Sequence, residues 1–122
     1  MLKSISHLAL TVKDPARTAA LFKDLYGARV LERQDDESHL ETFVRLAGTW
    51  LVLVGAEVER TRNGDHIAFH TTPEMLEATA ARLKAMGREF IRARDNTALY
   101  FFDYDDHVFE LETQDLEKQL GA

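Results

Sequence analysis

The chain lacks several features that define common functional classes. None of its 122 residues is a cysteine, which excludes disulfides, thiolate metal ligands and a cysteine nucleophile. No apolar run approaches the roughly 18 residues of a membrane-spanning helix, and the N-terminal residues lack the apolar core of a secretion signal. The net charge is −6 and no segment is rich in Lys or Arg, whereas nucleic-acid binding rests largely on basic contacts to phosphates. We therefore expect a cytoplasmic protein that binds neither nucleic acid nor membrane.

The composition is otherwise that of a soluble globular protein. Apolar residues make up 45% of the chain and charged residues 30%, both typical values. A chain of 122 residues is long enough to bury the core of one domain. Only two prolines are present, Pro15 and Pro73, and each occupies the same place in a repeated pattern.

This repeat has a period of about half the chain. The segment 6–10 (SHLAL) recurs as the segment 65–69 (DHIAF), and in each copy a proline-initiated helical segment follows. Such self-similarity indicates one supersecondary unit used twice. It places His7 and His66 at equivalent points of the two units, so that paired units can bring both imidazoles to one site.

Each copy predicts the same order of elements. In the first, residues 5–12 alternate between two faces, as in a half-buried strand. Asp14 and Pro15 favour the start of a helix, and Gly27 is typical of the residue after its end. Strands are then expected over 28–33, 39–46 and 50–55.

The second copy repeats this order. A strand over 66–70 precedes Thr72 and Pro73, which again favour a helix start, and Gly87 follows the helix. The remaining elements are strands over 89–93, 98–102 and 107–112, and a short closing helix within 114–120.

The pattern predicts an α+β fold built from two βαβββ modules. In a single domain we expect module one over 1–57, a linker over 58–64, module two over 65–112 and a closing helix over 113–122. Each mixed sheet is covered by a helix on one face, so two sheets side by side form a cup.

Three residues are candidate metal ligands. His7 and His66 share their place in the repeat, and Glu110 lies on the closing strand of module two. Aligning 50–54 with 107–111 makes Leu53 the counterpart of Glu110, which leaves three ligands and one apolar position. Two imidazoles and one carboxylate suit Mn, Fe, Zn or Ni, with coordination positions left open. A lone strand His is more often part of a packed core, but the repeated context favours a metal site.

The other three histidines are expected outside this site. In a strand His70 lies roughly 13 Å from His66, which is too far to share one ion. His107 follows a turn and is expected to be structural, and His39 is expected at the surface.

Glu41 is the candidate general base. It interrupts an otherwise apolar neighbourhood on its strand, and a carboxylate beside an apolar wall accepts a proton more readily. The alternative is a solvated carboxylate at a strand end. Tyr100 can donate a hydrogen bond to an anionic ligand, and Trp50 either walls the cup or packs in the core.

These residues resemble those of the vicinal oxygen chelate superfamily, and within it the fosfomycin-resistance metalloenzymes. The resemblance covers essentially the whole chain and rests on the segments SHLALTVKD, AGTWLVLV, DHIAF, LYFFDYDDHVFELET and DLEKQL. It implies a domain-swapped homodimer with paired βαβββ modules. It also implies a metal, usually Mn²⁺, bound by His7 of one subunit with His66 and Glu110 of the other. In the epoxide-hydrolysing branch a glutamate at the position of Glu41 activates the water that opens fosfomycin.

The chain departs from this pattern at positions that contact the phosphonate. Ala9 replaces a usual Thr, Ala98 a usual Ser and Gln119 a usual Arg, and the loop over 92–97 is shortened. Arg92 or Arg94 can compensate for the lost contacts. We expect Arg94, Tyr100 and Trp50 to bind substrate.

Other activities of the superfamily remain as alternatives. Thiol transfer from glutathione or bacillithiol leaves Glu41 without a role, and glyoxalase I chemistry is disfavoured because Leu53 stands at the fourth ligand position. Extradiol dioxygenases use the same ligand types. A metal-free dimer that binds a small molecule, like the bleomycin-binding members, is the alternative outside enzymes.

Overall fold

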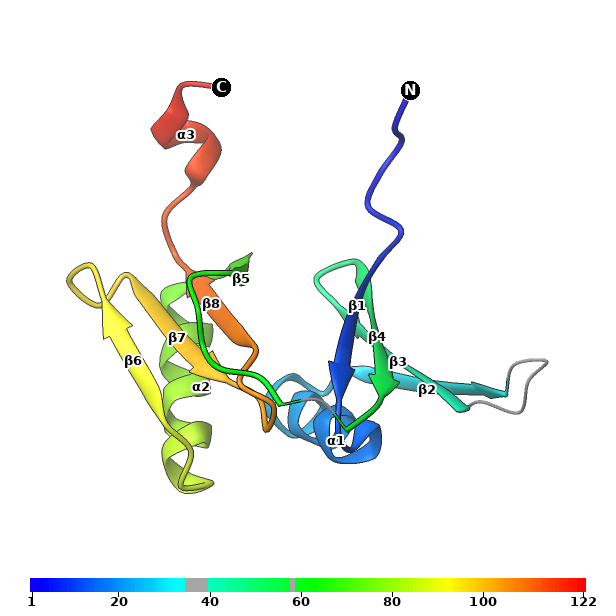
Figure 1. The fold of residues 1–122 in the computed structure, drawn as a ribbon. Helices are drawn as coiled ribbons and strands as arrows, with labels where there is room; N and C mark the ends of the chain where they lie inside the picture. Colours follow the sequence, from blue (N-terminus) through cyan, green and yellow to red (C-terminus); the bar gives the residue numbers. More distant parts are fainter. Residues whose placement is uncertain (35–39, 58) are drawn as a thin grey trace. The chain divides into compact units, whose positions relative to one another are not determined.

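The computed structural model describes residues 1–34, 40–57 and 59–122. It divides into two compact units, Met1–Glu59 and Arg60–Ala122, and the division falls within the segment 58–64 that the sequence marks as a linker. Each unit holds a four-stranded mixed sheet and a helix (Figure 1). The α+β fold of two βαβββ modules predicted from the repeat is confirmed.

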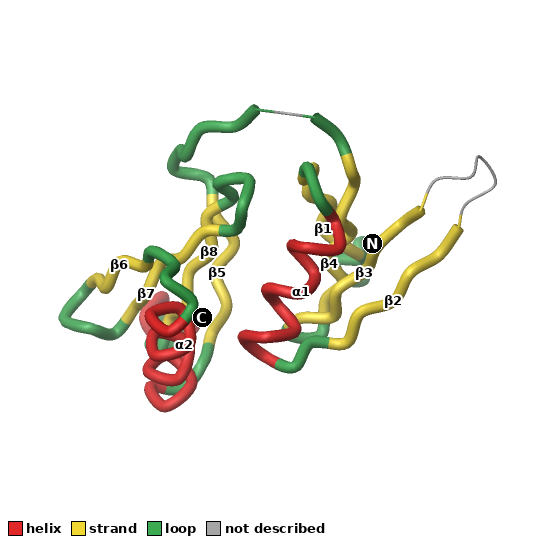
Figure 2. Tube along the Cα trace, turned by 90° about the horizontal axis from the view of Figure 1, so that it is seen from below, coloured by secondary structure: helices red, strands yellow, loops and turns green. Residues whose placement is uncertain are grey.

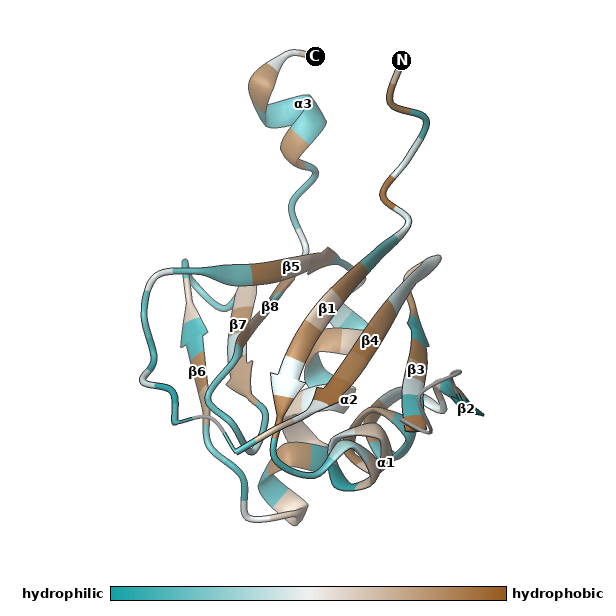
Figure 3. Ribbon diagram, turned by 45° about the vertical axis from the view of Figure 1, so that its right-hand side comes forward, coloured by the Kyte–Doolittle hydropathy of each residue, from teal (hydrophilic) through white to brown (hydrophobic). Residues whose placement is uncertain are grey.

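The first unit contains five elements: β1 (His7–Val12), α1 (Pro15–Tyr26), β2 (Arg29–Gln34), β3 (Leu40–Leu46) and β4 (Thr49–Gly55). Its strand order is β1-β4-β3-β2, with β1 parallel to β4 and the other pairs antiparallel. The tube in Figure 2 shows α1 running along one face of this sheet. The edge strand β2 is mostly polar and exposed, whereas β4 is mainly apolar (Figure 3).

Helix α1 forms where the sequence places its signals. The Asp14 side chain accepts a hydrogen bond from the Arg17 backbone N–H, and Gly27 ends the helix with a left-handed φ of 64°. Phe22 and Leu25 are among its buried residues, and the helix packs against β3 and β4, which carry the fully buried Val44 and Leu53. The opposite face of the sheet is therefore free for a binding site.

The second unit repeats the arrangement with β5 (His66–His70), α2 (Pro73–Ala85), β6 (Phe90–Ala93), β7 (Ala98–Phe102), β8 (Val108–Glu112) and α3 (Leu116–Leu120). Its strand order, β5-β8-β7-β6, is that of the first unit. Leu83 on α2 is fully buried together with Leu99, Phe101 and Phe109 of the sheet. The rings of Phe101 and Phe109 stack with centroids 5.4 Å apart.

The registers of the two sheets correct one prediction. His7 pairs with Trp50 and Ala9 with Val52, whereas His66 pairs with Val108 and Ala68 with Glu110. The counterpart of Glu110 is therefore Val52 and not Leu53, because a shift of one residue exchanges the two faces of a strand. Leu53 is fully buried on the α1 side of the sheet.

The physical reason for this shift is the length of the turns. In the first unit two residues join β3 to β4, whereas the segment 103–107 joins β7 to β8. His107 belongs to this longer turn rather than to the strand. Its Nδ1 lies 2.7 Å from Asp103 Oδ2, and both side chains are buried. The expected structural role of His107 is confirmed.

No helix in the described part of the chain combines the length and apolarity needed to cross a membrane.

Candidate active site

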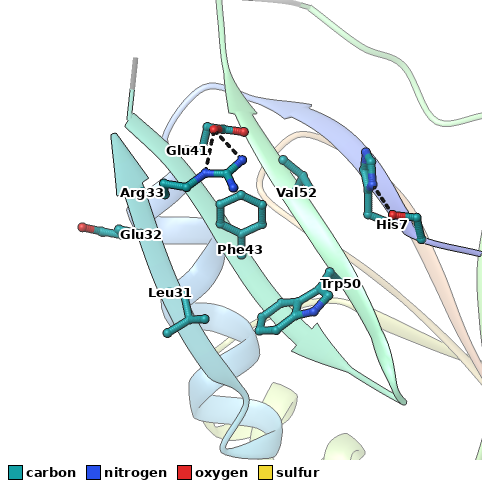
Figure 4. Close-up of a pocket in the computed structure, with 9 residues that line it drawn as sticks. His7, Leu31, Glu32, Arg33, Glu41, Phe43, Trp50 and Val52 are labelled. Atoms are coloured by element: carbon teal, nitrogen blue, oxygen red, sulfur yellow. Dashed lines mark hydrogen bonds and ion pairs between the residues drawn. The ribbon is translucent and has the colours of Figure 1, made fainter. Parts of the chain in front are cut away.

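The open face of the first sheet carries a cavity of about 590 Å³. Its lining combines apolar and polar side chains, which are Ser6, His7, Leu31, Glu32, Arg33, Glu41, Phe43, Trp50 and Val52. Figure 4 shows His7 on β1 facing the cavity from one side and Glu41 on β3 from the other. The candidate ligand, the candidate base and the candidate wall residue Trp50 therefore share one pocket within this unit.

His7 stands at the first position of β1, with an exposed imidazole. Its Nδ1 lies 3.0 Å from the Ser6 hydroxyl oxygen. This contact involves only Nδ1, so Nε2 is the atom that a metal could use, as in many metal-binding histidines.

Glu41 is held by Arg33 across the β2–β3 pair. Both Arg33 Nε and Nη2 donate to one carboxylate oxygen, Oε1, at 3.2 and 3.0 Å. The guanidinium also lies 5.1 Å from the centroid of the Phe43 ring. The surroundings of Glu41 are thus less apolar than the sequence indicates, and both contacts of Arg33 are to Oε1 rather than to Oε2.

Aromatic side chains form one wall of the cavity. Trp50 meets Phe43 edge to face, with ring centroids 6.3 Å apart and planes at 86°. Arg45 lies over the indole at 5.0 Å. Since Trp50 is half-exposed and lines the cavity, its role as a wall residue is favoured over one in the core.

The second unit holds a cluster of polar side chains on its open sheet face, which we call the Glu110 cluster. Its members are His66, Arg94, Tyr100, Glu110 and Glu112. The Glu110 side chain is only 8% exposed, and its Oε1 lies 3.0 Å from His66 Nε2. Glu110 faces Ala68 of β5 and Tyr100 of β7 in the sheet register.

The hydrogen bonding of His66 tests whether a metal fits. Its Nδ1 lies 2.9 Å from the Gly64 carbonyl oxygen, which can only accept, so Nδ1 carries a proton. In the neutral ring the Nε2 lone pair then faces the Glu110 carboxylate. Two acceptors at this distance need a proton or a cation between them, and two ligand atoms about 2.1 Å from one ion at a right angle lie about 3 Å apart. The pair therefore fits a divalent metal.

Arg94 occupies the other side of Glu110. Its Nη2 donates to Glu110 Oε2 and, at 3.3 Å, to Glu112 Oε2, while Nη1 donates to the Tyr100 hydroxyl at 3.3 Å. The hydrogen bond to Tyr100, with smaller contributions from the two carboxylates, raises the pKa of Arg94 above its ordinary value. Arg94 is therefore a permanent cation beside the candidate ligand Glu110.

The two units divide the predicted site residues between them. His66, Glu110, Tyr100 and Arg94 come together in the second unit, and His7, Glu41 and Trp50 in the first. Within the described residues, no three His, Asp or Glu side chains gather closely enough to hold a metal ion. His70 pairs in register with Glu112 rather than joining His66 at Glu110, and His39 lies outside the described residues.

Comparison with known protein families identifies the family of this chain. The model of the Glyoxalase/Bleomycin resistance protein/Dioxygenase superfamily matches residues 4–111. The chain belongs to this superfamily. It is 30% identical over 128 residues to the fosfomycin resistance protein FosX of Listeria innocua, an alignment that covers 98% of this chain and 96% of the relative. The metallothiol transferase FosB of Staphylococcus haemolyticus is also 30% identical, over 99% of this chain and 91% of its own length.

Solved structures of this superfamily agree with the fold. A variant of FosX from Listeria monocytogenes, complexed with Mn(II) and 1S,2S-dihydroxypropylphosphonic acid, matches with a TM-score of 0.85 and 32% identity. The match covers 98% of this chain and 99% of that one. FosX from Mesorhizobium loti matches with a TM-score of 0.83 and 26% identity over the whole of both chains.

The positions that depart from the superfamily pattern lie in three different settings. Ala9 is exposed on the open face of β1, whereas Ala98 is fully buried on β7 opposite Glu112. Gln119 lies in α3 and donates to the side chain of Gln114. Of the two arginines offered as replacements, Arg92 binds both carboxylate oxygens of Glu77 on α2 at 2.8 Å, so Arg94 alone joins the Glu110 cluster.

Sequence reasoning missed three groups in these sites. Arg33 is visible in the sequence, but its place opposite Glu41 follows only from the β2–β3 register. Strand alternation places Glu112 on the same face as Glu110, but the sequence alone indicates no role for Glu112 in the site. The Gly64 carbonyl belongs to the backbone, so no residue type in the sequence indicates its contact with His66.

Proposed function

We propose that the chain is a divalent-metal-dependent enzyme that opens the epoxide of fosfomycin, or of a related small anionic molecule, by adding water. The observation that carries this proposal is that His7 and Glu41 line one cavity. A metal ion bound on one side of a pocket would polarise the epoxide, and a carboxylate on the other side would take a proton from the attacking water.

The proposed metal ligands are His7, His66 and Glu110. The Nδ1 contacts of both histidines and the pairing of His66 with Glu110 support this set. We propose a homodimer in which His7 of one subunit joins His66 and Glu110 of the other. When bound, a divalent ion supplies Lewis-acid polarisation of the epoxide oxygen. The Mn(II) complexes of FosX favour Mn²⁺, and Fe²⁺, Zn²⁺ and Ni²⁺ accept the same ligands.

Glu41 is the proposed general base. Its Oε2 takes a proton from water as the water oxygen forms a bond to an epoxide carbon. The bond between that carbon and the epoxide oxygen breaks, and the resulting alkoxide takes a proton from solvent water to give a vicinal diol. Glu41 then releases its proton to solvent, so that one water molecule is added in all. Arg33 holds Oε1 throughout, so that the second oxygen stays directed at the cavity.

The relatives support this reaction and one alternative. The diol phosphonate in the FosX complex has hydroxyls on neighbouring carbons, which is the pattern that water leaves when it opens an epoxide. FosB is named a metallothiol transferase, which supports addition of a thiol at the same carbon. Glu41 favours water, because a thiolate attacks without a carboxylate base.

The test is turnover of fosfomycin with Mn²⁺, followed by phosphorus NMR with and without glutathione, bacillithiol or cysteine. The proposal predicts the diol without any thiol, and loss of at least about a hundredfold in kcat for Glu41→Gln. Glu74→Gln, which alters an exposed carboxylate on α2 outside the cavity lining, is the matched control. A thiol adduct as the sole product identifies a transferase, and protein that binds no metal supports a binding role instead.

A further inference from the structure

The two proposed metal ligands of the second unit stand on neighbouring parallel strands. His66 begins β5 and Glu110 lies on β8, and the two strands run side by side (Figure 2). His66 Nε2 lies 3.0 Å from Glu110 Oε1. Because parallel strands are entered from the same end, the segments that precede them help to set the register in which the ligands face each other.

Arg62 ties these two entries together. It lies four residues before His66 along the chain. Its Nε donates at 2.9 Å to a carboxylate oxygen of Asp106, which lies four residues before Glu110. One ion pair therefore joins equivalent points ahead of the two strands that carry the ligands.

Two further contacts fix the Arg62 side chain. Its Nη1 donates to Glu89 Oε1 at 2.9 Å, and its guanidinium carbon lies 3.5 Å from the centroid of the Phe102 ring. Phe102 shares a row of the sheet with His66, because the two residues pair with Val108 from its two sides. Arg62 is thus held over the end of the sheet face on which the ligands stand.

The chain between Arg62 and His66 carries this position to the imidazole. The Asn63 side-chain oxygen accepts from the Asp65 backbone N–H at 2.8 Å, which closes a tight turn. The turn presents the Gly64 carbonyl oxygen 2.9 Å from His66 Nδ1. A contact to the second ring nitrogen sets the orientation of a metal-binding histidine. The orientation of His66 therefore depends on a carbonyl in the segment that Arg62 anchors.

The exposure of the ion pair separates this role from stability. The side chains of Arg62 and Asp106 are 41% and 42% exposed, and pairs as exposed as this contribute little to the free energy of unfolding. We propose that Arg62 is a positioning residue of the metal centre, which holds His66 against Glu110 by tying the segment 62–66 to the turn before β8. The inference rests on the proposed function for the identity of the metal ligands.

The first test compares Mn²⁺ affinity, measured by calorimetry on the full chain, with the melting temperature of the metal-free protein. In Arg62→Met the affinity falls about tenfold, while the melting temperature changes little. Arg62→Lys restores part of the affinity, because an ammonium lacks the planar fork that holds two carboxylates at once. Arg92→Met is the matched control and keeps the wild-type affinity. Arg92 also holds a carboxylate, that of Glu77, and lies over an aromatic ring, that of Phe90, but it stands on β6 rather than ahead of a ligand strand.

Asp106→Gly separates the carboxylate from the backbone. Asp106 has a left-handed φ of 64°, which glycine adopts without strain. The variant therefore removes the partner of Arg62 and is expected to melt at or above the wild-type temperature. Its Mn²⁺ affinity falls as in Arg62→Met, and the double variant loses about as much as either single one, because both remove the same contact.

Nitrogen-15 relaxation of the metal-free protein gives a readout that needs no bound ion. In the wild type the backbone amides of Asn63, Gly64 and Asp65 are expected to have order parameters near about 0.85, and in Arg62→Met below about 0.6. The same amides in Arg92→Met keep the wild-type values.

Two results overturn the inference. Full Mn²⁺ affinity in Arg62→Met or Asp106→Gly shows that the metal centre does not need this anchor. A loss of affinity that is matched by a fall in melting temperature in both variants shows a role in folding alone. A wild-type protein that binds no Mn²⁺ contradicts the proposed function instead, and the order parameters then decide whether Arg62 holds the segment before His66.

Discussion

Val52 occupies in the first unit the register position that Glu110 occupies in the second. Val52 pairs with Ala9, two residues after His7, and Glu110 pairs with Ala68, two residues after His66. The scaffold is thus repeated in full, whereas the carboxylate is present in one copy only. In the proposed metal centre this difference leaves three protein ligands, and the remaining coordination positions stay open to water and substrate.

The register predicts opposite outcomes for glutamates at two neighbouring positions. Leu53→Glu buries a charge against α1, where Leu53 is fully buried, and we expect no folded protein. Val52→Glu faces the cavity of His7, so the protein folds and binds Mn²⁺ about tenfold more tightly through a fourth ligand. Circular dichroism and calorimetry check both variants. A folded Leu53→Glu protein contradicts the register.

The starts of the helices could be predicted from the sequence, whereas the register between strands could not. The helix starts at Pro15 and Pro73 follow from local capping chemistry, and both are confirmed within the predicted segments. The register depends on turn length. The turn over 103–107 is set by a buried contact between Asp103 and His107, which no local sequence pattern predicts.

The same limit applies to the candidate site. Residue types and the repeat single out His7, His66, Glu110 and Glu41, because these side chains are rare on strand faces. The choice between Arg92 and Arg94 is different, since it depends on a left-handed backbone at position 94 and on strand alternation that turns Arg92 towards α2. Tertiary geometry rather than composition makes that choice.

Arg33 is predicted to support catalysis more than stability. Arg33→Met removes the group that holds Glu41 Oε1, and we expect kcat for epoxide opening to fall about tenfold as the carboxylate loses its orientation. The ion pair is largely exposed, with Arg33 67% accessible, so the free energy of unfolding changes by less than about 1 kcal/mol. Steady-state kinetics and urea unfolding measure the two effects. A large loss of stability with unchanged kcat contradicts this role.

Asp103, in contrast, is predicted to support stability rather than catalysis. Its buried carboxylate accepts from the backbone N–H groups of Asp105 and His107 and contacts the His107 ring. Asp103→Ala leaves these buried donors unsatisfied and costs about 2–4 kcal/mol of unfolding free energy. Asp103→Asn, which keeps the acceptor oxygen, costs less. Urea unfolding gives both values, and equal costs contradict the hydrogen-bond account.

Trp50 offers a direct signal of cavity occupancy. It is the single tryptophan of the chain and lines the cavity, so binding of a substrate or its diol product changes the emission of the whole protein. The titration is followed by fluorescence at fixed Mn²⁺, with Trp50→Phe as the silent control. Emission that stays constant while calorimetry detects binding places the ligand away from this wall.

The central claim is a metal centre built from His7 of one subunit with His66 and Glu110 of the other, and mixing of two inactive variants tests it most directly. His7→Ala and Glu110→Gln are each expected to lose Mn²⁺ affinity by at least about a hundredfold. When the two are unfolded and refolded together in equal amounts, a mixed dimer contains one doubly altered centre and one intact centre. The account predicts that about a quarter of the wild-type Mn²⁺ sites and activity return in the mixture. If dimers form and no high-affinity Mn²⁺ site returns, the centre does not join His7 to the other subunit's Glu110, and the account is contradicted.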